Sequence, residues 1–176
     1  LIACIYLKNY IKKKWTNDES ISPSCPTLLS PVKQAIKDQA VDCLLALDQA
    51  NAQQIMSDVI AQICAFDFPF QWESLLPSLV QNINLENLDR TITILGCLNT
   101  IFKKYRYESR TDRLFGEIKF VLQSFASTYF QIYRLLDERL DREPADKNKL
   151  ALLKCIFLMN RIFYSLNFQD LPEFFE

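Results

Sequence analysis

The chain has 176 residues, 49% of them hydrophobic, and a formal net charge of −1, so it is long enough for a core and carries no overall charge that attracts nucleic acid or membranes. It contains no histidine, which excludes histidine general bases, Ser-His-Asp and Cys-His nucleophile systems and histidine-containing metal sites. Its two glycines, Gly96 and Gly116, lie too far apart for a phosphate-binding loop or a dinucleotide fingerprint. We therefore expect no catalytic site, no metal site and no cofactor.

The six cysteines are widely spaced and include no C-x-x-C pair. We expect free thiols in a reducing compartment rather than a disulfide framework. No run of residues approaches the roughly 20 apolar residues that span a bilayer. The chain starts at Leu1 in the middle of a helical pattern, and we interpret it as a piece of a longer protein.

The scarcity of glycine and the spacing of apolar residues predict an all-helical chain. The first predicted helix covers residues 2–15, and a linker rich in serine and proline follows at residues 16–30. Ser30 is expected to cap the next helix, with Pro31 in its first turn, and this helix continues to residue 47. Its predicted inward-facing residues are Val32, Ile36, Val41, Leu44 and Leu45.

The clearest amphipathic helix covers residues 51–66. Its apolar stripe follows the three- and four-residue spacing of a helix and consists of Ala52, Ile55, Met56, Val59, Ile60 and Ile63. Its opposite face carries Gln54, Asp58, Ala61 and Gln62. The helix therefore buries one stripe and leaves one polar face.

After a break at Asp67-Phe68-Pro69, further helices are predicted as far as the end of the chain. Asn87 is expected to cap one of them, Thr111 and Asp112 are expected to open another, and the Asp170-Leu171-Pro172 sequence is typical of a further helix start. The predicted ranges are 72–83, 88–105, 111–140 and 146–166.

The helices at 72–83 and 88–105 form the most regular antiparallel pair. A Leu-Leu-Pro sequence at 75–77 precedes a basic residue, Arg90, and then a small residue, Gly96, at which the second helix is expected to pack closely. This order resembles the HEAT repeat. Such pairs bury their apolar stripes only by stacking on neighbouring pairs, so the pattern favours an α-solenoid of HEAT-like antiparallel helix pairs over an irregular helical bundle.

Four segments resemble a known family. Leu-Lys-Asn-Tyr-Ile-Lys-Lys-Lys-Trp at 7–15 and Asp-Phe-Pro-x-x-Trp at 67–72 resemble the amino-terminal motifs of the importin-β, or karyopherin, superfamily of nuclear transport receptors. The segments 115–122 and 167–176 are similar to the CAS-type exportin branch. The four segments occur in the expected order along nearly the whole chain.

The resemblance implies a receptor that shuttles between nucleus and cytoplasm and returns importin-α to the cytoplasm. It implies binding to Ran-GTP and importin-α, and contact with nucleoporin repeats, without nucleic-acid binding or membrane insertion. Residues 1–176 would be one fragment covering about repeats two to five of the amino-terminal array. No family property is transferred to the linker at 16–30.

The resemblance also divides the candidate site residues into two groups. The helices that face Ran in the family would carry the Ran-binding candidates Lys8, Asn9, Lys12, Asp58, Gln62 and Arg90. A structural joint between repeats would contain Trp15, Asp67, Pro69 and Trp72. For the polar group, a solvated face whose lysines favour a helix C-terminus is the alternative.

Three other functions remain open at this point. An import receptor of the same superfamily would share the amino-terminal motifs but bind cargo without Ran. A HEAT-repeat scaffold would have no nucleotide switch. An all-helical enzyme is disfavoured because histidine and glycine-rich loops are absent from the sequence.

Overall fold

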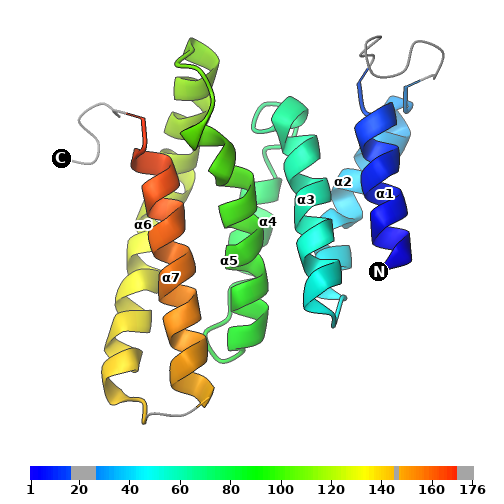
Figure 1. Ribbon diagram of the computed structural model, residues 1–176. Helices are drawn as coiled ribbons and strands as arrows, with labels where there is room; N and C mark the ends of the chain where they lie inside the picture. The colour runs from blue at the N-terminus through cyan, green and yellow to red at the C-terminus, as the bar shows by residue number, and fades with distance from the viewer. Residues whose placement is uncertain (17–26, 145–146, 170–176) are drawn as a thin grey trace. The chain divides into compact units, whose positions relative to one another are not determined.

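A computed structural model of the chain describes residues 1–16, 27–144 and 147–169. Every regular element in these ranges is helical, which confirms the predicted class (Figure 1). The chain divides into two compact units, Leu1–Leu75 and Leu76–Glu176. The elements in the described ranges are α1 (Ile2–Lys14), α2 (Ser30–Leu45), α3 (Ala50–Asp67), α4 (Leu75–Gln81), α5 (Leu88–Phe102), a short 3₁₀ helix η1 (Lys103–Arg106), α6 (Asp112–Arg142) and α7 (Lys147–Asn167).

In the first unit, α3 packs against both α1 and α2. The helices α2 and α3 are antiparallel neighbours joined by a tight turn, in which the Gln53 side chain donates to the Leu47 carbonyl at 2.6 Å. The helices α1 and α3 are parallel, because Lys8 contacts Asp58 and, further along both helices, Trp15 contacts Asp67.

In the second unit, α7 packs against α5, α6 and η1. The Tyr129 hydroxyl of α6 donates to the Met159 carbonyl of α7 at 3.1 Å, and α6 runs antiparallel to α7 (Figure 1). The helix α5 runs parallel to α7 (Figure 1), and Arg106, just beyond the end of α5, donates to Ser165 near the end of α7. Each unit thus combines antiparallel chain neighbours with a parallel next-but-one helix, which is the arrangement of stacked helix pairs.

The apolar stripe of α3 lies in the core of the first unit. Ala52, Met56, Val59, Ile60 and Ile63 are buried, as the periodicity predicted, whereas Ile55 is only partly buried. The opposite face of the same helix stays at least partly accessible at its polar positions. Hydrophobic periodicity was therefore a sufficient guide to the two faces of this helix.

The cap predicted at Asn87 and the helix start predicted at Thr111 are confirmed. The Asn87 side chain accepts from the Arg90 amide at 3.0 Å, and the Thr111 hydroxyl accepts from the Leu114 amide at 3.2 Å. The cap predicted at Ser30 is wrong, because Ser30 is the first helical residue and Leu29 occupies the cap position without a side-chain hydrogen bond.

The inward face of α2 also differs from the prediction. Val32 is exposed, and Ile36 and Leu45 are only partly buried. The buried residues of α2 are a lysine, Lys37, together with Ala40, Val41 and Leu44. Val32 lies in the first turn of the helix, where an apolar residue extends beyond the packed stripe. The stripe is therefore rotated toward Lys37, and that lysine needs a buried partner.

The helix predicted at 72–83 is shorter in the structure, where α4 covers only Leu75–Gln81. The residues before it form consecutive turns, in which the Gln71 amide donates to the Asp67 carbonyl at 2.7 Å and the Trp72 amide donates to the Pro69 carbonyl at 3.1 Å. These turns use the backbone groups that would otherwise begin the helix.

The close packing predicted at Gly96 is not observed. A Cβ atom placed on Gly96 would meet no other atom within 4 Å. The glycine has helical backbone angles in the middle of α5 and no positive φ. Packing around this position therefore does not require glycine.

One helix in the described ranges, α7, is long and apolar enough by composition to cross a membrane, with a mean hydropathy of 1.2 over its most apolar window. Its buried residues Leu152, Cys155, Met159, Ile162 and Leu166 recur every three to four positions, which is the pattern of a helix with one face in a protein core. The helix start predicted at Asp170 and most of the 16–30 linker lie outside the described residues.

Candidate functional site

The polar ridge of α1 contains the Ran-binding candidates Lys8, Asn9 and Lys12. Asn9 and Lys12 are exposed, whereas the Lys8 side chain is 35% exposed and its Nζ lies 2.6 Å from Asp58 Oδ2. Lys8 and Lys12 are one helical turn apart, so both lie on nearly the same side of α1. The ridge therefore includes one lysine that is already paired within the protein.

The polar face of α3 carries Asp58 and Gln62 one turn apart. The second oxygen of Asp58, Oδ1, accepts from Gln54 Nε2 at 3.1 Å, so both carboxylate oxygens bind groups of the protein. Within the described part of the chain, the buried Gln62 Oε1 has no hydrogen-bond partner. The structure thus brings Lys8 and Asp58 together, 50 residues apart in sequence.

Arg90, the remaining Ran-binding candidate, lies in the second unit near the start of α5. It is exposed, and its guanidinium donates to the Asn82 side chain across the α4–α5 turn. The Thr91 hydroxyl donates to the Asn84 carbonyl at 2.8 Å, and this hydrogen bond stabilises the same turn. Arg90 therefore stabilises its own helix pair in this structure.

Two of the residues predicted to form a joint, Trp15 and Asp67, meet at a buried carboxylate. Trp15 Nε1, at the end of α1, donates to Asp67 Oδ1 at 3.1 Å, and Lys37 Nζ of α2 lies 3.1 Å from Asp67 Oδ2. Lys37 also donates to the Gln71 carbonyl at 2.8 Å, and Lys33 Nζ lies 5.4 Å from the Trp15 ring centroid. One aspartate at the end of α3 thus connects three helices.

Pro69 and Trp72 lie in the turns that follow α3. Both are buried, and the Phe68–Pro69 peptide bond is cis. Phe68 is buried as well. These buried residues follow Asp67 within five positions in the chain and belong to the first unit.

Sequence reasoning missed Lys37 as a member of this network. Lysine is one of the residues that proteins bury least often, so a lysine in a helix is normally assigned to the solvated face. The available signal was its spacing: Lys37 lies three, four and seven positions before Ala40, Val41 and Leu44, in line with the buried stripe.

A second buried carboxylate, Glu117, was not singled out from the sequence either. Its Oε2 lies 2.5 Å from Lys104 Nζ and its Oε1 lies 3.3 Å from Arg113 Nε. Arg106 donates to Ser165 Oγ at 2.9 Å and to the Arg161 carbonyl at 3.0 Å. Two of the basic residues at 103–106 therefore bind groups of the second unit.

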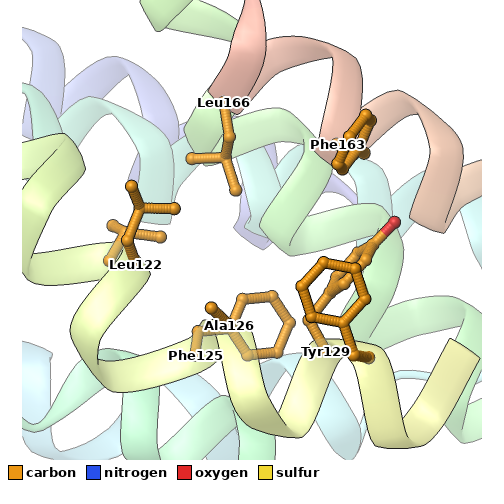
Figure 2. Close-up of a pocket in the computed structure, with 8 residues that line it drawn as sticks. Leu122, Phe125, Ala126, Tyr129, Phe163 and Leu166 are labelled. Atoms are coloured by element: carbon orange, nitrogen blue, oxygen red, sulfur yellow. The ribbon is translucent and has the colours of Figure 1, made fainter. Parts of the chain in front are cut away.

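An apolar pocket lies between α6 and α7, where Leu122, Phe125, Ala126 and Tyr129 face Phe163 and Leu166 of α7 (Figure 2). Val121 and Phe130 complete its lining. Burial raises the pKa of the Tyr129 hydroxyl, which donates to a backbone carbonyl. The lining thus consists of hydrocarbon and aromatic groups, with one hydroxyl that already has an acceptor.

The buried cysteine of α7 is a poor nucleophile. Burial, and secondarily the negative charge of Asp89, raise the pKa of the Cys155 thiol to about 11. The reactive form of a cysteine is the thiolate, which is scarce at neutral pH when the pKa is this high. Among the described residues no group of three His, Cys, Asp or Glu side chains is arranged to hold a metal ion.

Two family models match the chain. The model described as Cse1 matches residues 101–176, and the importin-beta N-terminal domain model matches residues 1–46. The solved structure of the exportin Cse1 in its cargo-free, cytoplasmic state has a TM-score of 0.86 to this chain at 28% identity, and the match covers 98% of this chain and 18% of that one. The fold is therefore that of an importin-β-type α-solenoid.

Curated relatives define the family more closely. The importin-alpha re-exporter of Schizosaccharomyces pombe is 36% identical over 100% of this chain. The proteins named exportin-2 in Danio rerio and Homo sapiens are 35% and 34% identical, each over 99% of this chain. The chain belongs to the exportin-2 family, and it spans 18% of the length of these relatives.

Proposed function

We propose that this chain is part of a nuclear export receptor that carries importin-α from nucleus to cytoplasm and binds importin-α tightly only together with Ran-GTP. The observation that carries the proposal is the similarity of nearly the entire chain to proteins named importin-alpha re-exporters or exportin-2. The match of residues 1–46 to the importin-beta N-terminal domain supports the Ran-binding part. In this proposal the chain covers about repeats two to five of the array.

The mechanism is coupled binding rather than chemistry. Ran-GTP and importin-α each favour the same state of the receptor, so each raises the affinity of the other. Hydrolysis of GTP on Ran removes that support and releases importin-α in the cytoplasm. The receptor itself acts as a binding protein, without a cofactor, and it shuttles through the nuclear pore by contacts with nucleoporin repeats.

The polar faces of α1 and α3 are the proposed Ran-binding surface. They belong to parallel helices of one compact unit, and they carry exposed Asn9 and Lys12 together with Asp58 and Gln62. Arg90, in the second unit, is the candidate from α5. A ridge of polar groups on rigid helices suits a partner that is recognised by its surface rather than by a deep pocket.

The proposal is tested by comparing the two nucleotide states of Ran. The intact protein that carries residues 1–176 is expected to bind Ran loaded with a non-hydrolysable GTP analogue at least tenfold more tightly than Ran-GDP, as measured by calorimetry. Equal affinity for both forms would contradict the Ran switch and leave the scaffold alternative.

An import receptor of the same superfamily is distinguished by the sign of the coupling. Cargo retention on the immobilised protein is measured with and without Ran-GTP. An exporter retains more importin-α when Ran-GTP is present, whereas an import receptor loses its cargo under the same condition.

A further inference from the structure

The ion pair between Lys8 and Asp58 joins two helices that both carry candidate partner-binding residues. Lys8 Nζ lies 2.6 Å from Asp58 Oδ2, and the two side chains are 35% and 31% exposed. Gln54 Nε2 holds the other carboxylate oxygen at 3.1 Å. The ammonium and the carboxylate are therefore matched within the protein before any partner arrives.

A further side-chain connection lies along the same helix–helix contact. It is the bond from Trp15 Nε1 to Asp67 Oδ1 at 3.1 Å. The two connections are seven residues apart on α1 and nine residues apart on α3, which corresponds to roughly 10 and 14 Å along the helix axes. Two connections at this separation fix the register of parallel helices as well as their spacing.

This pairing removes the Lys8 charge from the set of charges that the ridge offers to a partner. Lys8 and Asp58 neutralise each other, so a partner that approaches the ridge meets the exposed groups beside them, Asn9 and Lys12 of α1. A partner that used the Lys8 ammonium directly would first have to separate it from Asp58, and the aspartate would lose its cation. The geometry therefore suits Lys8 and Asp58 to holding the helices in position, and Asn9 and Lys12 to touching a partner.

We propose that Lys8 is a positioning residue, which acts on Asp58 to hold α1 in register with α3 and thereby places Asn9 and Lys12 for a protein partner. This inference rests on the proposed function in one respect, because its affinity test measures the binding of Ran-GTP. In this proposal Lys8 and Asp58 hold each other in place, and their exposed neighbours Asn9 and Lys12 make the direct contacts with the partner.

A charge swap tests the assignment. The variants are Lys8→Glu, Asp58→Lys and the double variant in the intact protein, and the measured quantity is the Kd for Ran with a non-hydrolysable GTP analogue. Each single change opposes like charges across the α1–α3 contact and is expected to weaken binding about tenfold, and the double change restores the Kd to within about threefold. A double variant that binds as weakly as Lys8→Glu alone would overturn the proposal.

Lys12→Glu serves as the matched control, because it changes the same charge one turn away on the exposed side of α1. Lys12→Glu is expected to weaken binding as well, and addition of Asp58→Lys is not expected to restore it. Rescue of Lys12→Glu by Asp58→Lys would mean that a general charge balance, rather than the Lys8–Asp58 contact, controls affinity, and would overturn the proposal.

Urea unfolding of the unmodified protein, the two single variants Lys8→Glu and Asp58→Lys, and their double variant separates this inference from the proposed function. Each single change is expected to lower the ratio of folded to unfolded protein about two- to fivefold, and the double change is expected to restore it. If the unmodified protein fails to bind Ran-GTP but shows this coupling, the Ran proposal fails and the positioning role stands. If the unfolding data show no coupling, the positioning role fails whatever the affinity.

Discussion

At the scale of single residues, the Asp67 carboxylate makes the most consequential contacts. Its side chain and that of Lys37 are 9% and 7% exposed, and the Trp15 indole shares the carboxylate. Removing one member of a buried ion pair leaves an uncompensated charge, which costs far more than an exposed pair contributes. Trp15 and Asp67 lie in the two motifs that could be recognised in the sequence. Their partner Lys37 looks like a surface lysine, and only its spacing from the buried stripe of α2 indicates otherwise.

The substitution Asp67→Ala is therefore expected to lower the free energy of unfolding by about 3–5 kcal/mol. It leaves the Lys37 ammonium buried with only the Gln71 carbonyl, and it leaves the Trp15 indole without its acceptor. The measurement is equilibrium unfolding in urea. The double substitution Asp67→Ala with Lys37→Met is expected to recover part of the loss, because no buried charge remains.

Arg134→Ala provides the control for this prediction. Arg134 and Glu138 form an ion pair whose side chains are 79% and 46% exposed, so its removal is expected to change the unfolding free energy by less than about 0.5 kcal/mol. An Asp67→Ala effect as small as that of Arg134→Ala would show that the Asp67 network contributes nothing beyond a surface pair.

At the scale of helices, local chemistry predicted some boundaries and missed others. The starts of α5 and α6 were predictable because Asn87 and Thr111 supply caps from residues next to the helices. The start of α4 was not, since the Pro69 and Trp72 turns use backbone groups that the apolar pattern alone assigns to a helix. The Lys8–Asp58 contact was unpredictable for a different reason, because helix packing brings together residues that are 50 positions apart.

The helix α5 offers a test of the packing found at Gly96. Because a Cβ atom at this position meets nothing within 4 Å, Gly96→Ala is expected to raise the free energy of unfolding by about 0.5–1 kcal/mol through the higher helix propensity of alanine. The urea midpoint of the intact protein measures the change. A loss of stability would instead mean that another part of the protein packs against this position.

At the scale of the whole molecule, the fold could be predicted from the spacing of apolar residues, and the family from short sequence motifs. Periodicity and glycine scarcity predicted the helical class, and the repeat-like order of residues around 75–98 favoured stacked pairs. The superfamily came from the motifs at 7–15 and 67–72, and the segments at 115–122 and 167–176 narrowed it to the exportin branch. The partner-binding roles of Lys8, Asn9, Lys12, Asp58, Gln62 and Arg90 stay predictions.

Coupled binding gives the proposed function a quantitative signature at this scale. The factor by which Ran-GTP raises the affinity for importin-α must equal the factor by which importin-α raises the affinity for Ran-GTP, because both describe one coupling free energy. Each factor is measured by titrating one ligand in the absence and in a saturating presence of the other. Two unequal factors would mean that the ligands do not share one linked equilibrium, and a factor of one would contradict the export mechanism.

The parallel contact of α1 with α3 has a consequence for how the protein is made. The partners of Lys8 and Trp15 follow them by 50 and 52 residues, so at a synthesis rate of about 5–20 residues per second they leave the ribosome roughly 3–10 s later. During that interval Lys8 and Trp15 are without the α3 partners that they have in the folded unit. The α1–α3 contact therefore forms only after the α2–α3 hairpin has emerged, so the register of these parallel helices is not set while α1 itself is being synthesised.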